Sequence, residues 1–586
     1  MARYRTSGRL DDQVLQDGDR GFRGIDSYKE ATSLEPGFVQ TSENMRLIGD
    51  LAEVRKGIDF LAGAVTLSYN GTNEMVFAST LYSDPATGNE YVVVATKDKV
   101  ILWNDANNSG IDIDYPGSEV VATADGASFV QALEKLILFR GKNKTPLEWD
   151  GDVSNDFVVK ANASQGAGRI QCPNTDYGVF FRNRLIIPQP TDSNYSIIMS
   201  DLLDTDNYYA AESQFRINKG SADFLVGFFP YQEDQLIVFM RNSIHMINNV
   251  ATTSASNTYE ITRQHGCVAR KSIAQSGPQT FFLSDNGVIV LSPGTDPAKG
   301  LGVAISKVSG ETIPMTRPIQ DQFDEVNFAA ADTACGVVYD NKYFLAVPTG
   351  SSTVPNKIFI FNLLTSTWTS VDSYPAMSGS VAFHVDDWVI CSHGSNPTRR
   401  RLFAGNKTGW YLMEENSIDD SGRKIGSTSE SGTTAIAGKL VTRSYTFGDI
   451  SVKSWKRGQL GANTVNADAF NIKVNTLDPD SSTTVLSHTA DGTEEALFRF
   501  GTGRTRGYGA NIEINVTAGR PSFRHLSLEA IGEEQMQDVR WHNGNYLYIN
   551  SWIYFRNRSG FKFSESKRVG RANSYSSKRN RYNSSA

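Results

Sequence analysis

The sequence predicts an all-β protein built around a β-propeller, and three observations lead to this fold class. The first is a hairpin pattern that recurs about every 50 residues. The second is composition: aromatic residues make up 11% of the 586 residues and there are 50 glycines, and strands and tight turns use both heavily. The third is that helical signals are few, with the segment LDDQVLQ at 10–16 as one short candidate.

Each repeat consists of an apolar run, a short polar turn and a second apolar run, as in EYVVVATKDKVILWN. Val, Ile, Phe and Tyr favour pleated, half-buried strands, and Asp, Asn and Gly accept the positive φ of tight hairpin turns. The turn centres lie at Asp98, Glu134, Asn183, Asp234, Asn286, Asn341 and Asp387, which are 36, 49, 51, 52, 55 and 46 residues apart. A period near 50 indicates four-stranded propeller blades, although seven unrelated hairpins in a large β protein are the alternative.

One unit also shows an outer hairpin, KIFIFNLLTSTWTSVD, from Lys357 to Asp372. It has the pattern of strand, turn and strand, and it is similar to the outer edge of a kelch-type blade. We expect Trp368 in this hairpin to pack between two blades.

The pattern changes after about residue 415, where a polar stretch rich in Gly and Ser begins. Strand patterns then return in KLVTRSYTF, FNIKVNTL, ANIEINVTA and RHLSLEAIG. We therefore expect an N-terminal segment with a docking hairpin at 1–62, the propeller at 63–415, a linker or exposed loop at 416–435, a small appended β domain at 436–555 and a basic flexible tail at 556–586.

The net charge of −7 conceals an uneven distribution. Residues 556–586 hold nine Lys or Arg and one acid, so this tail carries +8 and the rest of the chain −15. An acidic body binds nucleic acid poorly because phosphate affinity comes from Lys and Arg. We expect the tail to bridge to an acidic partner through Arg568, Arg571, Lys578 and Arg579, or else to be a solvated tail.

The four cysteines are too widely spaced for a CxxC pair or a dense disulfide framework, which fits a reducing compartment such as a bacterial cytoplasm. The first residues lack the apolar core of a signal peptide, and no apolar run approaches the ~20 residues of a membrane span.

A search for catalytic and ligand-binding motifs finds no P-loop, no HExxH, no GxSxG and no paired CxxC. His265 with Cys267, and Cys391 with His393, could each supply two metal ligands or a thiol and a base, but buried cysteines beside turn histidines are the simpler interpretation. Carboxylate pairs such as Asp386 and Asp387 could serve a glycosidase, or be solvated turn acids. We expect no metal and no cofactor.

The segment GFRGIDSYKEATSLEPGFVQTSENMRLIGDLAEVRKGIDF, from Gly21 to Phe60, is the most specific part of the chain. It resembles the N-terminal signature of podovirus tail nozzle proteins, also called tail tubular protein B or tail hub proteins. The matching positions are Leu34, Pro36, Gly37, Glu43, Asn44, Met45, Arg46, Gly49, Arg55 and Gly57. From the residues themselves we expect two strands joined at Ile48-Gly49-Asp50, with Arg46 and Arg55 on either side.

The resemblance implies a structural virion protein without enzymatic activity, located in the tail and made in the host cytoplasm. Its expected partners are five further copies in a homohexameric ring, an adaptor ring above it, tail fibres, and viral double-stranded DNA that passes through the lumen without specific binding. We expect Arg46, Arg55 and Gly49 to dock on the ring above. The alternatives are a propeller-type glycan hydrolase of the tail and a propeller binding module, such as an adhesin or lectin.

Overall fold

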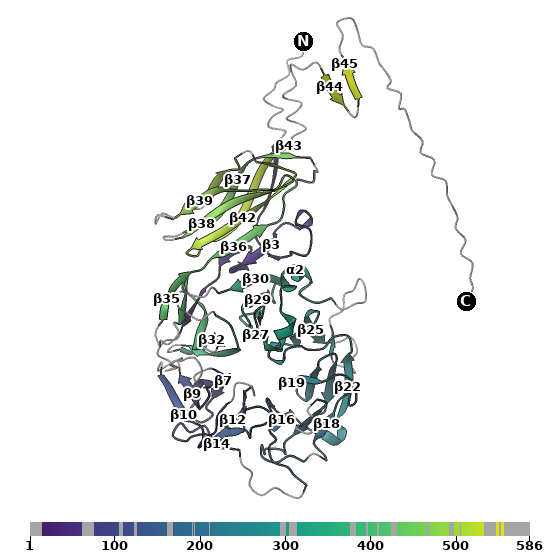
Figure 1. Ribbon diagram of the computed structural model, residues 1–586, viewed down its shortest axis with the longest axis vertical. Coiled ribbons are helices and arrows are strands. Elements are labelled where there is room, and N and C mark those ends of the chain that lie inside the picture. Colours follow the sequence, from purple (N-terminus) through teal and green to yellow (C-terminus); the bar gives the residue numbers. More distant parts are fainter. Residues whose placement is uncertain are drawn as a thin grey trace, which may run out of the picture.

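The computed structural model consists of a ring of β-blades with a second β body beside it (Figure 1). It describes residues 14–60, 76–104, 109–121, 126–160, 168–189, 192, 194–209, 211–293, 301–303, 313–374, 383–393, 396–406, 409–423, 430–449, 451–464, 468–490, 497–503, 505–532, 546–549 and 552–555. The predicted all-β class with a propeller is confirmed.

The propeller contains six separate four-stranded antiparallel blades. In each blade the strands are given from the innermost outward. The first two blades are β7 (Ala78–Ser83), β8 (Glu90–Ala95), β9 (Lys99–Asn104) and β10 (Ser109–Asp114), and then β11 (Ser128–Ala132), β12 (Lys135–Phe139), β13 (Leu147–Trp149) and β14 (Val158–Val159). The next two are β15 (Val179–Phe181), β16 (Arg184–Pro188), β17 (Ser196–Met199) and β18 (Gln214–Arg216), and then β19 (Leu225–Tyr231), β20 (Gln235–Met240), β21 (Ile244–Asn248) and β22 (Asn257–Thr262). The last two are β23 (Ala274–Ser276), β24 (Gln279–Ser284), β25 (Gly287–Pro293) and β26 (Leu301–Val303), and then β31 (Asp387–His393), β32 (Asn396–Asn406), β33 (Gly409–Glu415) and β6 (Gly57–Phe60).

A seventh four-stranded unit completes the ring and extends into a larger sheet. It consists of β27 (Cys335–Tyr339), β28 (Lys342–Val347), β29 (Lys357–Asn362) and β30 (Thr367–Ser373). Its inner strand β27 contacts β23 on one side and β31 on the other, and β31 contacts β7, so the ring is closed.

Blade strands are apolar throughout because both of their faces are covered by neighbouring blades. In β8, Val93 and Ala95 pack into the core shared with the next blade, whereas Val92 and Val94 pack into the core shared with the last one. Single residues therefore alternate between two buried interfaces, which gives a continuous apolar run instead of an apolar–polar alternation.

The predicted turns are confirmed at most of the seven positions. Asn183 and Asn341 each follow another residue with positive φ, as a two-residue primed turn requires. Asp98 and Asn286, however, lie in the second hairpin of their blades, whereas Glu134, Asn183, Asp234 and Asn341 lie in the first. The step from a second to a first hairpin explains the short spacing of 36 residues between Asp98 and Glu134. The turn near Asp387 is wrong, because Asp387 begins the single strand β31.

The second body is a sandwich of two sheets. The seven-stranded sheet consists of β1 (Val14–Asp19), β4 (Met45–Ile48), β5 (Leu51–Val54), β37 (Lys453–Asn463), β40 (Leu497–Gly501), β41 (Arg506–Gly507) and β43 (Ser522–Gly532); the ten-stranded sheet adds β2 (Gly24–Ile25), β3 (Phe38–Glu43), β36 (Gly438–Thr442), β38 (Ala469–Leu477), β39 (Ser481–Thr489) and β42 (Gly509–Ala518) to the seventh blade unit. Strictly alternating burial in β38 shows that it faces a core on one side only.

The N-terminal segment is built into both bodies. Strands β1, β4 and β5 belong to the sandwich, β3 pairs with β36 and touches β30, and β6 closes the last blade against β33. The predicted helix around LDDQVLQ is wrong from Val14 onward, because β1 pairs there with β43. Residues 416–435, predicted to be a linker or loop, contain the hairpin of β34 (Asp419–Arg423) and β35 (Glu430–Ala435).

The remaining elements are short. They are η1 (Ala31–Ser33), η2 (Thr253–Ala255), η3 (Arg270–Ser272), η4 (Arg317–Ile319), α2 (Gln320–Phe323), η5 (Phe328–Thr333) and the hairpin of β44 (Tyr546–Ile549) and β45 (Trp552–Phe555). Within the described ranges, no helix has the length and apolar character needed to span a membrane.

Candidate functional site: the junction at the N-terminal hairpin

The predicted hairpin between β4 and β5 is confirmed, with its turn at Gly49 and Asp50. Both turn residues have positive φ, 58° at Gly49 and 65° at Asp50, which glycine adopts without strain and aspartate tolerates. Ile48 beside the turn is 51% exposed, so the tip of the hairpin presents an apolar side chain to solvent.

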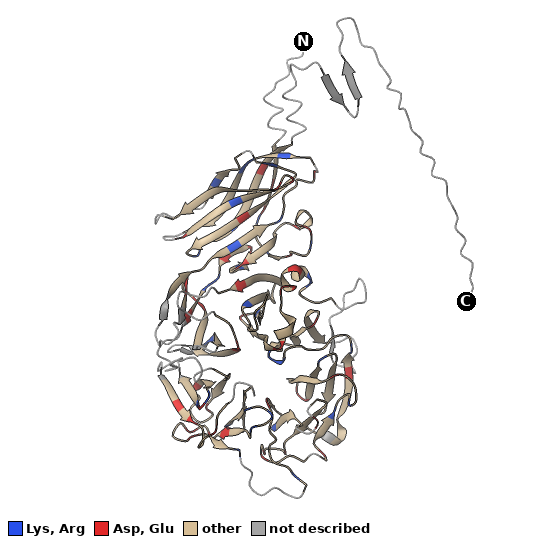
Figure 2. Ribbon diagram, viewed as in Figure 1, with Lys and Arg blue, Asp and Glu red and all other residues tan. Residues whose placement is uncertain are grey.

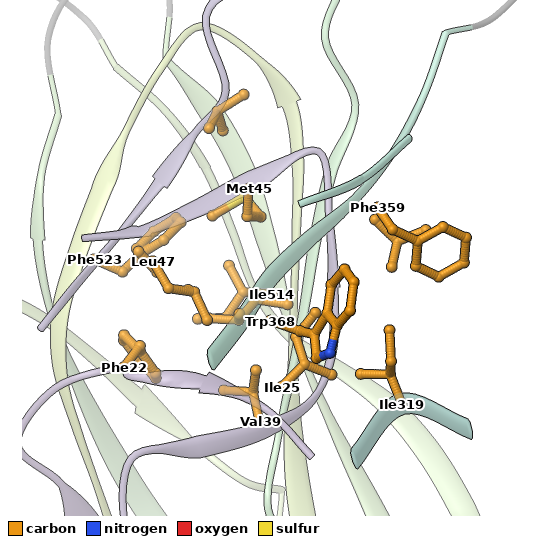
Figure 3. Packing of buried hydrophobic residues seen from close by; sticks show 14 of the residues in the cluster. Phe22, Ile25, Val39, Met45, Leu47, Ile319, Phe359, Trp368, Ile514 and Phe523 are labelled. Atoms are coloured by element: carbon orange, nitrogen blue, oxygen red, sulfur yellow. The ribbon is translucent and has the colours of Figure 1, made fainter. Parts of the chain in front are cut away.

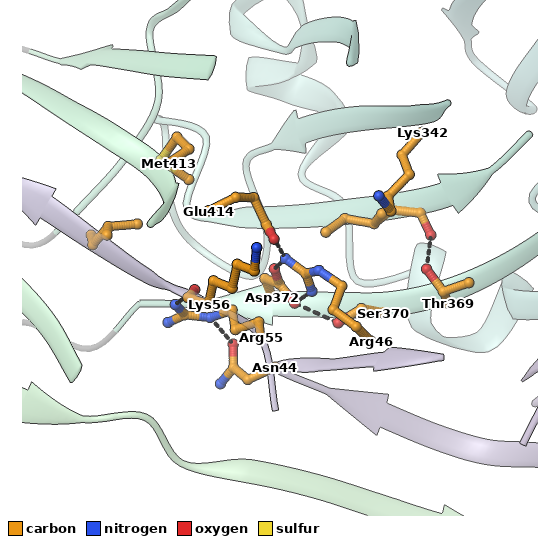
Figure 4. Close-up of polar contacts among 12 residues, drawn as sticks. Asn44, Arg46, Arg55, Lys56, Lys342, Thr369, Ser370, Asp372, Met413 and Glu414 are labelled. Atoms are coloured by element: carbon orange, nitrogen blue, oxygen red, sulfur yellow. Dashed lines mark hydrogen bonds and ion pairs between the residues drawn. The ribbon is translucent and has the colours of Figure 1, made fainter. Parts of the chain in front are cut away.

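Arg46 in β4 points into the interior and joins three segments of the chain (Figure 4). Its Nη1 and Nη2 donate to the two carboxylate oxygens of Asp372 at 3.0 and 2.7 Å, and Nη2 also forms an ion pair with Glu414. Burial opposes the charge of Arg46, but the two carboxylates outweigh it and raise the pKa of the guanidinium above its ordinary value. The bidentate geometry holds β4 against the propeller strands β30 and β33.

Arg55, directly after β5, is fully buried and makes a second bidentate contact. Its Nη1 donates to Asp420 Oδ1 at 2.7 Å, Nη2 bonds the other oxygen of Asp420, and Nε donates to Asn44 Oδ1 at 3.1 Å. The guanidinium carbon lies 3.9 Å from the ring centroid of Tyr374, a cation–π contact. Arg55 therefore fastens the hairpin β34–β35 to the N-terminal segment.

Asn44, which accepts the hydrogen bond from Arg55, also bonds two further segments of the chain. Its φ is +55°, which asparagine tolerates better than most residues. Its Oδ1 accepts the backbone N–H of Ser373 at 3.0 Å, and its Nδ2 donates to the carbonyl of Ala437 at 2.8 Å. One side chain thus links the outer blade strand to the sandwich.

The burial of both arginines corrects the sequence-based interpretation. Arg46 is 4% and Arg55 0% exposed, so neither guanidinium is at the surface to meet another ring. Docking on a ring remains a prediction for the hairpin tip at Gly49. The tail residues Arg568, Arg571, Lys578 and Arg579 lie outside the described residues.

A hydrophobic core next to the ion pairs joins the two bodies (Figure 3). Trp368 of β30 is 1% exposed and contacts the rings of Phe359 and Phe361, and its Nε1 donates to the carbonyl of Met315 at 2.7 Å. It shares this core with Ile25 and other residues of the N-terminal segment and the sandwich. The same core contains Val288 and Val290 of β25 in the neighbouring blade, and the N–H of Met315 donates to the carbonyl of Val288. Trp368 therefore packs between two blades, as predicted, and the core that it belongs to continues into the sandwich.

The sequence analysis missed Asp372, Glu414 and Asp420, the carboxylates that complete the junction. Each lies more than 300 residues from its arginine. No local spacing could pair them, and Asp420 stands in a polar stretch that gives no sign of burial.

In the described part of the chain, no group of three potential metal ligands occurs. Cys267 is fully buried and its Sγ donates to the carbonyl of Ala269, while His265 beside it is 8% exposed. Burial raises the pKa of the Cys267 thiol to about 12 and that of Cys172 to about 11. The side chain of His393 lies outside the described residues.

These thiols should be inert in the folded chain, because the thiolate is the reactive form and all four cysteines are buried. We expect Ellman's reagent to label them at least about tenfold more slowly in buffer than in urea. Stoichiometric labelling of Cys172 or Cys267 within minutes under native conditions would contradict this assignment.

Of the acids Asp386 and Asp387, Asp387 forms an ion pair within the ring. The side chain of Asp387 is 12% exposed. It accepts one hydrogen bond from Lys271 Nζ at 2.5 Å and another from the backbone N–H of Ser79 at 3.1 Å. Burial raises the pKa of Asp387, and Lys271 counteracts this rise. Because Lys271 precedes β23 and Ser79 lies in β7, this ion pair ties inner strands of the ring together.

No family model matches the sequence, and no curated protein matches it. Among solved structures, a chain from S. cerevisiae Dbp5 bound to Nup159 and Gle1 is 10% identical with a TM-score of 0.35, covering 67% of this chain and 99% of that chain. The extracellular domain of BT4673 from B. thetaiotaomicron is 10% identical with a TM-score of 0.38 over 80% of this chain and 62% of that chain. A glycoside hydrolase is 10% identical, with a TM-score of 0.23 and coverage of 80% and 100%. Similarity at this level carries no inference about function.

Proposed function

We propose that the chain is a structural subunit of the tail nozzle of a short-tailed bacteriophage. Six copies form a ring below an adaptor ring, and the ring surrounds the distal channel through which DNA leaves the particle. The resemblance of residues 21–60 to tail nozzle proteins is the origin of this proposal.

One structural observation supports the proposal more than any other: the segment that carries the resemblance also joins the two bodies. It contributes β4 and β5 to the sandwich, β3 to the sheet that both bodies share, and β6 to the last blade. Buried ion pairs at Arg46 and Arg55 add charge-assisted contacts to these strands. A subunit built in this way is rigid, and rigid subunits suit a closed ring that must keep its shape during ejection.

The proposed mechanism is geometric and electrostatic, with no chemical step. Outside the last 31 residues the chain carries a net charge of −15. Acidic and basic residues are interspersed over both bodies, as Figure 2 shows. A ring of six such bodies repels phosphate on average, and DNA therefore moves past it without tight binding. The basic tail reaches an acidic face of a neighbouring subunit.

A nonsense codon early in the gene tests the proposal. We expect phage particles grown without the protein to lack the distal part of the tail and to lose infectivity. The protein supplied from a plasmid should restore both properties. Particles with normal tails would contradict the proposal, and release of reducing sugars from host polysaccharide by the purified chain would favour the glycan hydrolase instead.

A further inference from the structure

A small pocket opens beside the tip of the β4–β5 hairpin. Its volume is about 230 Å³, and its lining comes from the segment 18–23, from Pro36 and Gly37, and from Asp50 at the hairpin turn. Sites for drug-sized ligands have volumes of about 300–1,000 Å³. The pocket is therefore large enough for the end of one side chain, but too small for a nucleotide or a sugar chain.

Hydrogen bonds hold the walls of the pocket in place. The N–H of Phe22 donates to the carbonyl of Asp50 at 3.1 Å, and the N–H of Arg23 donates to the carbonyl of Gly37 at 2.8 Å. The N–H of Gly37 donates to Oδ1 of Asp19, which is 2% exposed, at 3.0 Å. These bonds join the three lining segments, so the pocket is already formed before a ligand enters it.

Two glycines leave the backbone of the pocket uncovered. A Cβ added at Gly21 would lie 2.4 Å from the Cβ of Asp50, and Gly37 has a φ of +90°, which residues with a side chain rarely adopt. Across the described ranges the N–H of Gly21 makes no hydrogen bond, although Gly21 is buried. Buried N–H groups without a partner are rare in folded proteins. This donor therefore indicates an acceptor that comes from outside the chain.

The lining also carries one positive charge that no carboxylate balances. It contains Arg20, Arg23 and a single acid, and Arg23 Nε lies 3.6 Å from a carboxylate oxygen of that acid. Arg20 is exposed, and within the described part of the chain its guanidinium makes no ion pair or hydrogen bond. Asp19, which precedes Arg20, is buried and accepts from Arg443 Nε at 3.0 Å. The lining, ion pair included, has a net charge of +1.

An apolar side chain stands next to the pocket. Ile48, which pairs with Leu51 across the hairpin, is 51% exposed. Protein interfaces combine apolar contacts with arginine more often than the rest of a protein surface does. A protein partner can cover Ile48 and place a carboxylate in the pocket at the same time, whereas a free small acid can do only the second.

We propose that the pocket receives one Asp or Glu side chain of the protein that docks on the hairpin tip. Arg20 is the main contact, and the N–H of Gly21 is a second donor. A guanidinium and a backbone N–H both form strong, charge-assisted hydrogen bonds to a carboxylate. This inference rests on the proposed function, in which the docking protein belongs to the adaptor ring above.

The test uses phage with the early nonsense codon and supplies variants of the full chain from a plasmid. Arg20→Glu places a second carboxylate in the pocket, so we expect it to lower the amount of chain in purified particles at least tenfold, measured by immunoblot against the capsid protein. Because Arg20 is exposed, the purified variant should unfold at the same urea concentration as the wild type. Arg20→Gln, which removes only the charge, should lower incorporation to a smaller extent.

The matched control is Arg499→Glu. Arg499 is also exposed, and it lies in β40, at the opposite end of the sheet order from β4. This variant should enter particles as the wild type does.

Prolonged growth on the host that supplies Arg20→Glu identifies the partner. We expect it to select phage in which an Asp or Glu of another tail protein has become Lys or Arg. Normal incorporation of Arg20→Glu overturns the inference, and so do compensating substitutions that occur only in this chain or not at all. If the wild-type chain is itself absent from particles, the proposed function is wrong and the inference falls with it.

Discussion

Replacement of Arg55 by methionine is expected to lower the free energy of unfolding by about 3–5 kcal/mol. The substitution leaves Asp420, which is 1% exposed, as a buried carboxylate without its counter-ion. It also removes the hydrogen bond from Nε to Asn44 and the contact with Tyr374. The measurement is urea-induced unfolding of the full chain, followed by far-UV circular dichroism.

Two controls separate the lost ion pair from a general effect of the substitution. The double variant Arg55→Met, Asp420→Leu should recover most of the stability, because an apolar pair of similar volume replaces a buried ion pair at little cost. Arg263→Met removes an exposed arginine that is paired with Glu260 and should change the unfolding midpoint very little. Equal destabilisation by Arg55→Met and Arg263→Met would show that the buried ion pair contributes no more to the free energy of unfolding than an exposed one.

Replacement of Trp368 by alanine is also expected to have a large effect, lowering the free energy of unfolding by about 3–5 kcal/mol. The side chain is 1% exposed, and its removal leaves a cavity between Phe359, Phe361 and the N-terminal strands. The hydrogen bond to the carbonyl of Met315 is lost as well. Because this core joins the two bodies, hydrogen exchange should become faster in β3 and β30 before it does so in the distant blades.

Leu364 provides the control for this substitution, since it lies in the turn of the same hairpin and is 77% exposed. Leu364→Ala should leave stability and exchange unchanged. If Trp368→Ala accelerates exchange uniformly over all blades, or not at all, the tryptophan does not couple the propeller to the sandwich.

The blade hairpins could be predicted from the sequence because their determinants are local. The turn at Asn341 needs only two adjacent residues with positive φ and apolar strands on either side of them. The phase of the hairpins within each blade could not be predicted, because the first and second hairpins of a blade have the same pattern. Thus Asp98 and Asn183 look equivalent in the sequence although they occupy different turns.

The closure of the ring and the junction depend on pairings over long distances in the chain. Strand β6 pairs with β33 more than 350 residues later, and nothing in Gly57–Phe60 itself specifies that partner. The docking expected of Arg46 and Arg55 in the N-terminal hairpin requires exposed side chains, as charged residues usually have. Their burial depends on Asp372 and Asp420, and one sequence contains no signal that joins these residues.

Strand β37 (Lys453–Asn463) shows why part of the sandwich was missed. Its sequence KSWKRGQLGAN contains three charged residues and two glycines, so it lacks the apolar–polar alternation of a half-buried strand. Its pairing with β43 contains two register shifts, which interrupt the period of two. Burial by the neighbouring strands, rather than its own propensity, makes this segment a strand.

The proposed place of the chain at the distal end of a phage tail is tested most directly by immunogold electron microscopy. Antibody raised against the purified chain is applied to intact particles of the source phage. We predict gold label at the distal end of a short tail in most labelled particles. Label on side fibres, or none on the particle, would contradict the proposal.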